Sequence, residues 1–135
     1  MTPELTALAL AALWQMVMVA VAGAVMNREL GLGYNFGPRD RAPEASPLLG
    51  RLRRAVANHA ENLGLFAAAV LVVTLSGRAS PFTAACAWAF LAARILYLPA
   101  YAFGWTPWRS LIWLIGLVAT LAMILAALFG AAAAA

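Results

Sequence analysis

The sequence predicts an all-α integral membrane protein built as a bundle of four transmembrane helices. Of its 135 residues, 65% are hydrophobic and only 10% are charged, whereas a soluble domain is about half apolar and a quarter charged. Four long apolar runs are interrupted by short polar connections, and a run of about 20 apolar residues is long enough to cross a bilayer. Because lipid cannot satisfy backbone N–H and C=O groups, each run is expected to be helical.

The expected spans are residues 5–26, 49–75, 81–103 and 107–129, within a single domain that covers 1–135. The first span follows MTPEL, which has an acidic residue and no basic residue, so we expect a membrane helix rather than a cleaved signal peptide. The third starts at Pro81, a favoured first residue of a helix. The connection 27–48 is rich in glycine, proline and charge, which predicts a loop outside the hydrocarbon.

The arginines predict which loops face the cytoplasm. All nine basic residues are arginine, and the net charge is +4. The arginines of the first loop and its flanks are Arg28, Arg39, Arg41, Arg51, Arg53 and Arg54. Arg109 lies at the third loop, and only Arg78 lies on the opposite side. The positive-inside rule therefore predicts that loops one and three are cytoplasmic and both termini are outside, in the inner or cell membrane if the source is bacterial. The same clustering at membrane edges gives no indication of a nucleic-acid partner.

Polar residues recur inside two of the expected spans. One face of the second helix carries Arg51, Arg54, Asn58 and Glu61, and one face of the third carries Arg94, Tyr97 and Tyr101. Glu61 lies roughly 12 Å along the helix from Arg53, a depth at which an unpaired carboxylate is costly. Arg94 is expected at a similar depth and offers a partner, so we expect a polar pocket in the cytoplasmic half that faces the bundle interior or a subunit interface.

This polar stretch has two interpretations. A Glu61–Arg94 pair could simply fix helix packing. However, one pair leaves the other arginines and two tyrosines unexplained, and an excess of guanidinium groups is typical of a site for an anionic ligand. Ionisable residues inside a membrane indicate function by default, so we favour a binding pocket.

Other notable residues have simpler interpretations. Cys86 lies in an apolar run, which predicts a small buried side chain. His59 has no second histidine or cysteine nearby, so no metal site is expected. The segment YNFGPRD indicates a turn with an internal Arg39–Asp40 pair, or alternatively a lid. Tryptophans are interpreted as interfacial or packing residues, namely Trp14, Trp88, Trp105, Trp108 and Trp113.

Over nearly its whole length the chain resembles the MAPEG family, the membrane-associated proteins of eicosanoid and glutathione metabolism, and in particular its bacterial-type members. The resemblance rests on three motifs together with the four spans and the long first loop. The motifs are RxxxNxxE at Arg54, Asn58 and Glu61, the arginine–tyrosine set at Arg94, Tyr97 and Tyr101, and the pair Arg109–Ser110.

The resemblance implies a homotrimer with three glutathione sites, each between adjacent subunits and open to the cytoplasm. Its expected glutathione-binding residues are Arg28, Arg51, Arg54, Asn58, Glu61, Arg94, Tyr97, Tyr101 and Ser110. Arg109 is the expected catalytic residue, placed near the sulfur. The implied function is a transferase or peroxidase that uses glutathione as co-substrate, requires no metal, and acts on lipophilic molecules drawn from the membrane lipids.

Three positions depart from the eicosanoid-forming members. A prostaglandin-forming member has an arginine in place of Ala57 and a tyrosine in place of Trp113, and the leukotriene-forming member has a tyrosine in place of Asn62. These departures disfavour both eicosanoid activities. A non-catalytic lipid- or small-molecule-binding protein of the same fold is the main alternative. A small drug-exporting transporter is less favoured, because its essential intramembrane glutamate would lie in the first helix, where only Glu4 occurs at the edge.

Overall fold

A computed structural model describes residues 1–41 and 43–130 of the chain. Its long helices are α1 (Pro3–Leu30), α3 (Pro47–Leu75), α4 (Pro81–Ala102) and α5 (Trp108–Phe129), and a short helix, α2 (Leu32–Phe36), follows α1. All four long helices are long and apolar enough to cross a membrane. The predicted four-helix membrane bundle is therefore confirmed.

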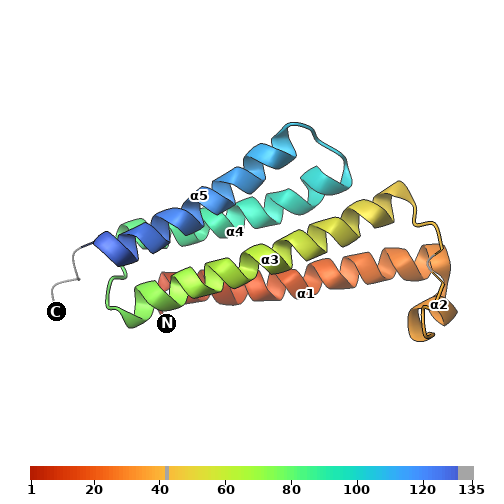
Figure 1. The fold of residues 1–135 in the computed structure, drawn as a ribbon, viewed down its shortest axis with the longest axis horizontal. Coiled ribbons are helices and arrows are strands. Elements are labelled where there is room, and N and C mark those ends of the chain that lie inside the picture. The colour runs from red at the N-terminus through yellow and green to blue at the C-terminus, as the bar shows by residue number, and fades with distance from the viewer. Residues whose placement is uncertain (42, 131–135) are drawn as a thin grey trace.

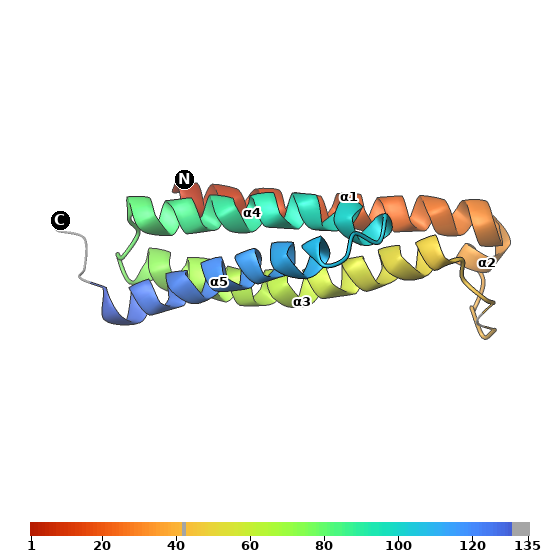
Figure 2. The ribbon, with the colours of Figure 1, turned by 90° about the horizontal axis from the view of Figure 1, so that it is seen from above.

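The long helices pack as two antiparallel pairs. In Figure 1, α1 lies beside α3, and α4 lies beside α5. The second view shows that α4 covers α1 and α5 covers α3 (Figure 2). The N-terminus and the α3–α4 connection lie at one end, here called the terminal end. The opposite end, here called the loop end, holds α2 and the α4–α5 connection.

Three of the long helices begin with proline, and in each the preceding residue carries a side-chain hydroxyl. Thr2 and Ser46 cap α1 and α3 through their side-chain oxygens, which accept backbone N–H bonds of 3.3 and 3.1 Å. Ser80 and Thr83 form a reciprocal capping box at the start of α4. Proline suits the next position because its missing N–H would have no partner there in any case.

Helical structure extends beyond the apolar pattern at the loop end. Helix α1 continues past the predicted span end at 26 to Leu30, and α2 lies inside the connection predicted to be a loop. Gly31 separates the two helices with a φ of 82°, a conformation that favours glycine. The hydrophobic pattern marks only the part of a helix that contacts apolar surroundings, whereas backbone hydrogen bonds carry α1 onward.

The predicted Arg39–Asp40 pair is not the contact that forms. The Arg39 guanidinium donates to the backbone oxygen of Asn35, with Nε–O and Nη2–O distances of 3.1 and 2.8 Å, and also to the Asn35 side-chain oxygen. Arg39 has a φ of 58°. The segment is therefore closed by an arginine that reaches back to the end of α2.

Two apolar clusters form the interior of the bundle. The larger lies toward the terminal end and is centred on the stacked rings of Phe66 and Phe90, whose centroids are 3.8 Å apart. The smaller lies toward the loop end, around Met18 and Leu52. Along each long helix, a short stretch of residues separates the two clusters. These stretches contain the polar side chains described next.

Candidate functional site

A layer of buried or half-buried polar side chains divides the apolar interior. Its members come from three helices: Trp14 and Gln15 of α1, Asn58, His59 and Asn62 of α3, and Arg94 of α4. The layer is held by hydrogen bonds both between helices and within α3. The Trp14 ring N–H donates to the Arg94 carbonyl at 3.1 Å, and the Asn62 amide donates to the Asn58 carbonyl at 2.8 Å.

Arg94 is the central charge of this layer. Its side chain is 0% exposed, and Nη1 donates to Asn58 Oδ1 at 3.2 Å. Within residues 1–41 and 43–130, its Nε and Nη2 have no hydrogen-bond partner. The guanidinium lies over the rings of Phe90 and Tyr97, 5.1 and 5.5 Å from their centroids. Burying a charge with so few hydrogen bonds costs several kcal/mol, so this guanidinium is suited to receive an anion.

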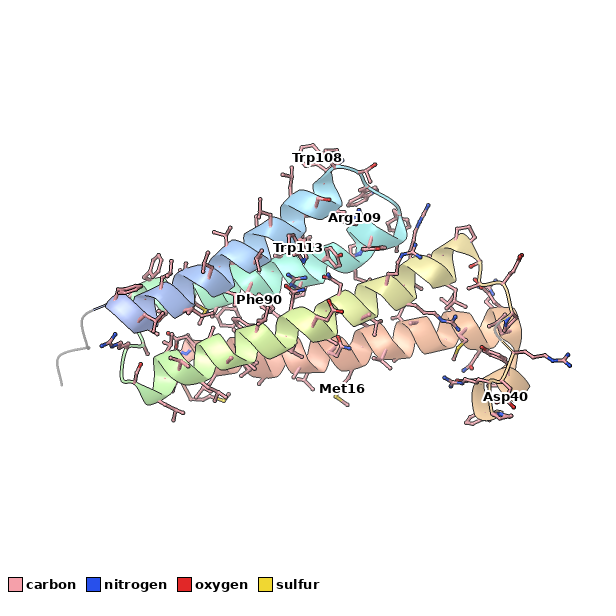
Figure 3. The ribbon with its side chains drawn as sticks, viewed as in Figure 1. Met16, Asp40, Phe90, Trp108, Arg109 and Trp113 are labelled. Carbon is pink, nitrogen blue, oxygen red and sulfur yellow. The ribbon has the colours of Figure 1, made fainter. Side chains whose placement is uncertain are left out.

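An open pocket adjoins Arg94 on the side of Asn58. It has a volume of about 200 Å³ and is lined by Asn58, Tyr97, Tyr101, Arg109, Ser110 and Trp113. In Figure 3, Arg109 and Trp113 project from the inner side of α5, whereas Trp108 points away from the bundle. The pocket therefore lies between the start of α5, the second half of α4 and the middle of α3.

Two further guanidinium groups converge on Tyr101. Arg109 lies over its ring, 4.7 Å from the centroid. Arg54 Nε donates to the Tyr101 hydroxyl at 3.2 Å. Together with Arg94 these groups surround the pocket with positive charge, and guanidinium groups bind carboxylates through paired N–H bonds. The arrangement can hold an anionic ligand and stabilise a negative charge that develops near Arg109.

Within the described part of the single chain, the expected Glu61–Arg94 pair does not form. Arg94 bonds to Asn58, and Glu61 is exposed on α3. The sequence placed Asn58 and Glu61 on one face, but they are about 60° apart around a helix. Asn58 is turned toward α4, and Glu61 is turned to the surface of the single chain.

The structure brings together only part of the predicted glutathione set. Asn58, Tyr97, Tyr101 and Ser110 line the pocket with Arg109. Arg94 and Arg54 touch this group through Asn58 and Tyr101.

The remaining predicted residues lie away from the pocket of this single chain. Arg28 is exposed in the last turn of α1. Arg51 donates to the Ala102 carbonyl at 3.2 Å, and its guanidinium approaches Gly104. Arg51 therefore caps the C-terminal end of α4, where a positive charge is favourable.

Two residues of the site were missed by sequence reasoning. Trp113 lines the pocket, although it was interpreted as an interfacial or packing residue and was not included among the expected site residues. Gly116 is buried directly against the Arg94 guanidinium. They follow Arg109 by four and seven residues, the spacing of one helix face. That periodicity was available in the sequence, but it has meaning only once Arg109 is known to face inward.

Four helices long and apolar enough to span a membrane, three of which line an open pocket that contains Arg109, define an integral, multi-pass membrane protein. The model of the MAPEG family matches residues 5–129, nearly the whole chain. The chain therefore belongs to the MAPEG family of membrane proteins, which is associated with glutathione and eicosanoid metabolism. No curated protein and no solved structure matches the chain significantly.

Proposed function

We propose that the protein is a glutathione-dependent membrane transferase or peroxidase that acts on lipophilic electrophiles or hydroperoxides. The observation that carries the proposal is the fully buried Arg94 guanidinium, with two nitrogens that have no partner in the described residues, beside a pocket that also holds Arg109. An unpaired buried charge is costly to keep. Binding of a carboxylate would offset that cost, and glutathione has two carboxylates.

The pocket chemistry fits activation of a thiol. A free thiol has a pKa of about 8.5 and is mostly protonated at neutral pH. In the proposed complex, Arg94 and Arg54 hold the carboxylates, and Arg109 stabilises the thiolate. The thiolate then forms a thioether with an electrophilic carbon, either by displacing a leaving group that departs with the electron pair of its bond or by opening an epoxide whose oxygen takes a proton from water. Alternatively it attacks the terminal oxygen of a hydroperoxide, which gives an alcohol and a glutathione sulfenic acid that a second thiol reduces.

A second copy of the chain would complete the site. The pocket of about 200 Å³ is smaller than the roughly 300–1,000 Å³ of common ligand sites. Glu61 is exposed at the level of the polar layer, where a carboxylate facing lipid is unfavourable. These observations support the homotrimer implied by family membership, in which Glu61 meets the glutathione ammonium and Arg28 reaches the ligand across the subunit boundary. Positive-inside orientation would open the site to cytoplasmic glutathione.

The test is a glutathione titration of the purified, detergent-solubilised protein, followed by the ultraviolet absorbance of the thiolate. Arg109→Ala should lower the thiolate formed at saturation by about tenfold or more, since one pKa unit corresponds to a tenfold change. Glu61→Gln should abolish binding. Arg41→Ala is the matched control, because this arginine is exposed in the first connection and should leave both signals unchanged.

Absence of glutathione binding by the unaltered protein would refute this function and favour a non-catalytic binding protein. That alternative is supported by an apolar groove of about 770 Å³ between α4 and α5. Its lining includes Phe82, Cys86, Leu114 and Val118. The groove offers room for a hydrocarbon ligand without any charged partner. In that case a lipid-like probe would bind, and glutathione would not.

A further inference from the structure

We infer that Gly116 of α5 is a positioning residue for Arg94, an inference that rests on the proposed role of Arg94 in ligand binding. A Cβ atom at Gly116 would lie 2.9 Å from Arg94 Nη2 and 3.2 Å from Nε. The first distance is shorter than side chains adopt, so any larger residue would displace the guanidinium. Gly116 therefore provides the space in which the charged head of Arg94 lies.

Arg94 has little freedom to move away from a bulkier residue. It is completely buried, and Asn58 holds its Nη1 at 3.2 Å. Phe90 lies against the guanidinium and is itself stacked on Phe66. Because interiors are close-packed, an added methyl group at position 116 has to alter the hydrogen bond to Asn58 or the direction of the guanidinium.

Gly116 lies against the part of the guanidinium that has no hydrogen-bond partner in the described chain. Nε and Nη2 are the two nitrogens nearest to the glycine, and they are also the two without a partner in residues 1–41 and 43–130. These two nitrogens of an arginine can form paired bonds to a carboxylate. The Gly116 carbonyl does not bind them and accepts the Thr120 hydroxyl at 3.0 Å. Gly116 therefore leaves just enough room for the guanidinium itself, and a carboxylate has to approach Nε and Nη2 from a direction other than Gly116.

From these contacts it follows that position 116 sets how well the carboxylate is held and leaves thiolate activation to Arg109. Gly116→Ala should weaken glutathione binding by about tenfold, the effect of a lost or misdirected charged hydrogen bond. KM should rise accordingly, while the thiolate absorbance of the saturated complex should stay unchanged. A general loss of folding would instead lower the number of sites and leave the affinity of the remaining ones intact.

The experiment combines Gly116→Ala with Arg94→Lys, which removes Nη2, the atom that would lie nearest to the added Cβ. The control is Gly64→Ala, since a Cβ there meets nothing within 4 Å. Thermal unfolding without ligand and the dissociation constant for glutathione are both measured. Gly116→Ala should lower Tm and affinity in the native background and have a clearly smaller effect beside Arg94→Lys. Gly64→Ala should raise Tm slightly, because alanine favours helix over glycine, and leave affinity unchanged.

The inference is overturned if Gly116→Ala binds glutathione as tightly as the unaltered protein, or if its effects add fully to those of Arg94→Lys. If Gly116→Ala alone does not fold, Arg94→Lys should restore folding, and failure to do so also overturns it. Should the unaltered protein bind no glutathione, the proposed function fails. The ligand-free Tm comparison then still decides whether Gly116 and Arg94 are coupled.

Discussion

Glu4 and Arg94 are both buried charged side chains, and the bundle treats them differently. At the terminal end, Glu4 is 1% exposed and its Oε1 accepts the Thr83 hydroxyl at 2.6 Å. Thr83 lies in the first turn of α4, where the helix N-terminus stabilises a negative charge. Glu4 Oε2 has no partner in residues 1–41 and 43–130, and in the polar layer the equally buried Arg94 leaves two nitrogens without one.

The contrast separates charges that stabilise the fold from charges that are available to a ligand. Glu4 joins the start of α1 to the start of α4 through its bond to Thr83, which is made within one chain. Removing the Thr83 hydroxyl leaves a buried carboxylate without that hydrogen bond, which is destabilising. Removing an unpaired charge relieves a cost. Substitutions at the two places should therefore have opposite effects on stability and on binding.

Arg94→Met should give the largest effect on binding. Methionine keeps an unbranched apolar stem and removes the charged head group, so glutathione affinity should fall by about 100-fold or more, as expected for charged hydrogen bonds. Tm should stay the same or rise, because an unpaired buried charge is removed. Calorimetric titration and thermal unfolding of the detergent-solubilised protein measure the two effects. A large drop in Tm would show that the Arg94 side chain stabilises the folded protein. The proposed difference between Arg94 and Glu4 would then be wrong.

Thr83→Val, at the terminal end, should lower stability without changing glutathione affinity, the opposite of the result expected for Arg94→Met. The substitution keeps the shape but removes the donor to Glu4 and one half of the α4 capping box. Stability should fall by about 1–3 kcal/mol, seen as a lower Tm, and glutathione affinity should not change.

Thr74→Val is the matched control for this substitution. The Thr74 hydroxyl is buried without a hydrogen-bond partner in the described part of the chain, so its loss should be neutral or slightly stabilising. Equal losses for the two threonines would show that the Thr83–Glu4 bond contributes nothing of its own.

These two regions also differ in how far the sequence predicts them. The four spans follow from apolar length alone, and one-face spacing correctly brings Tyr97 and Tyr101 to one pocket. Partners across helices depend on rotations that spacing within one helix does not determine. Asn58 therefore takes the place predicted for Glu61 beside Arg94. The Glu4–Thr83 contact joins residues 79 positions apart, and no local pattern indicates it.

A similar limit applies to Gly116. Its importance comes from a missing side chain, so no chemical group in the sequence marks it. The close approach of the Arg94 guanidinium reveals it only when α4 and α5 are packed together.

The smallest effects are expected at Arg51 and Arg78, two arginines that bind backbone carbonyls at the ends of helices. Arg78 donates to the Ala127 carbonyl in the last turn of α5, as Arg51 does to Ala102 at the end of α4. Each cation therefore lies where a helix presents unpaired carbonyls. Alanine at either position should lower stability by about 0.5–1 kcal/mol, measured by thermal unfolding.

Glutathione affinity is the measurement that tests the role of Arg51, because Arg51 is among the expected glutathione-binding residues and Arg78 is not. If Arg51 is a helix cap, Arg51→Ala should change glutathione affinity by less than about twofold, which is roughly 0.4 kcal/mol, and should match Arg78→Ala in Tm. If Arg51→Ala instead weakens binding tenfold with Tm unchanged, the guanidinium leaves Ala102 to meet the ligand. Arg51 would then belong with Arg94 among the charges available for binding, and only the arginine at the terminal end would serve the fold alone.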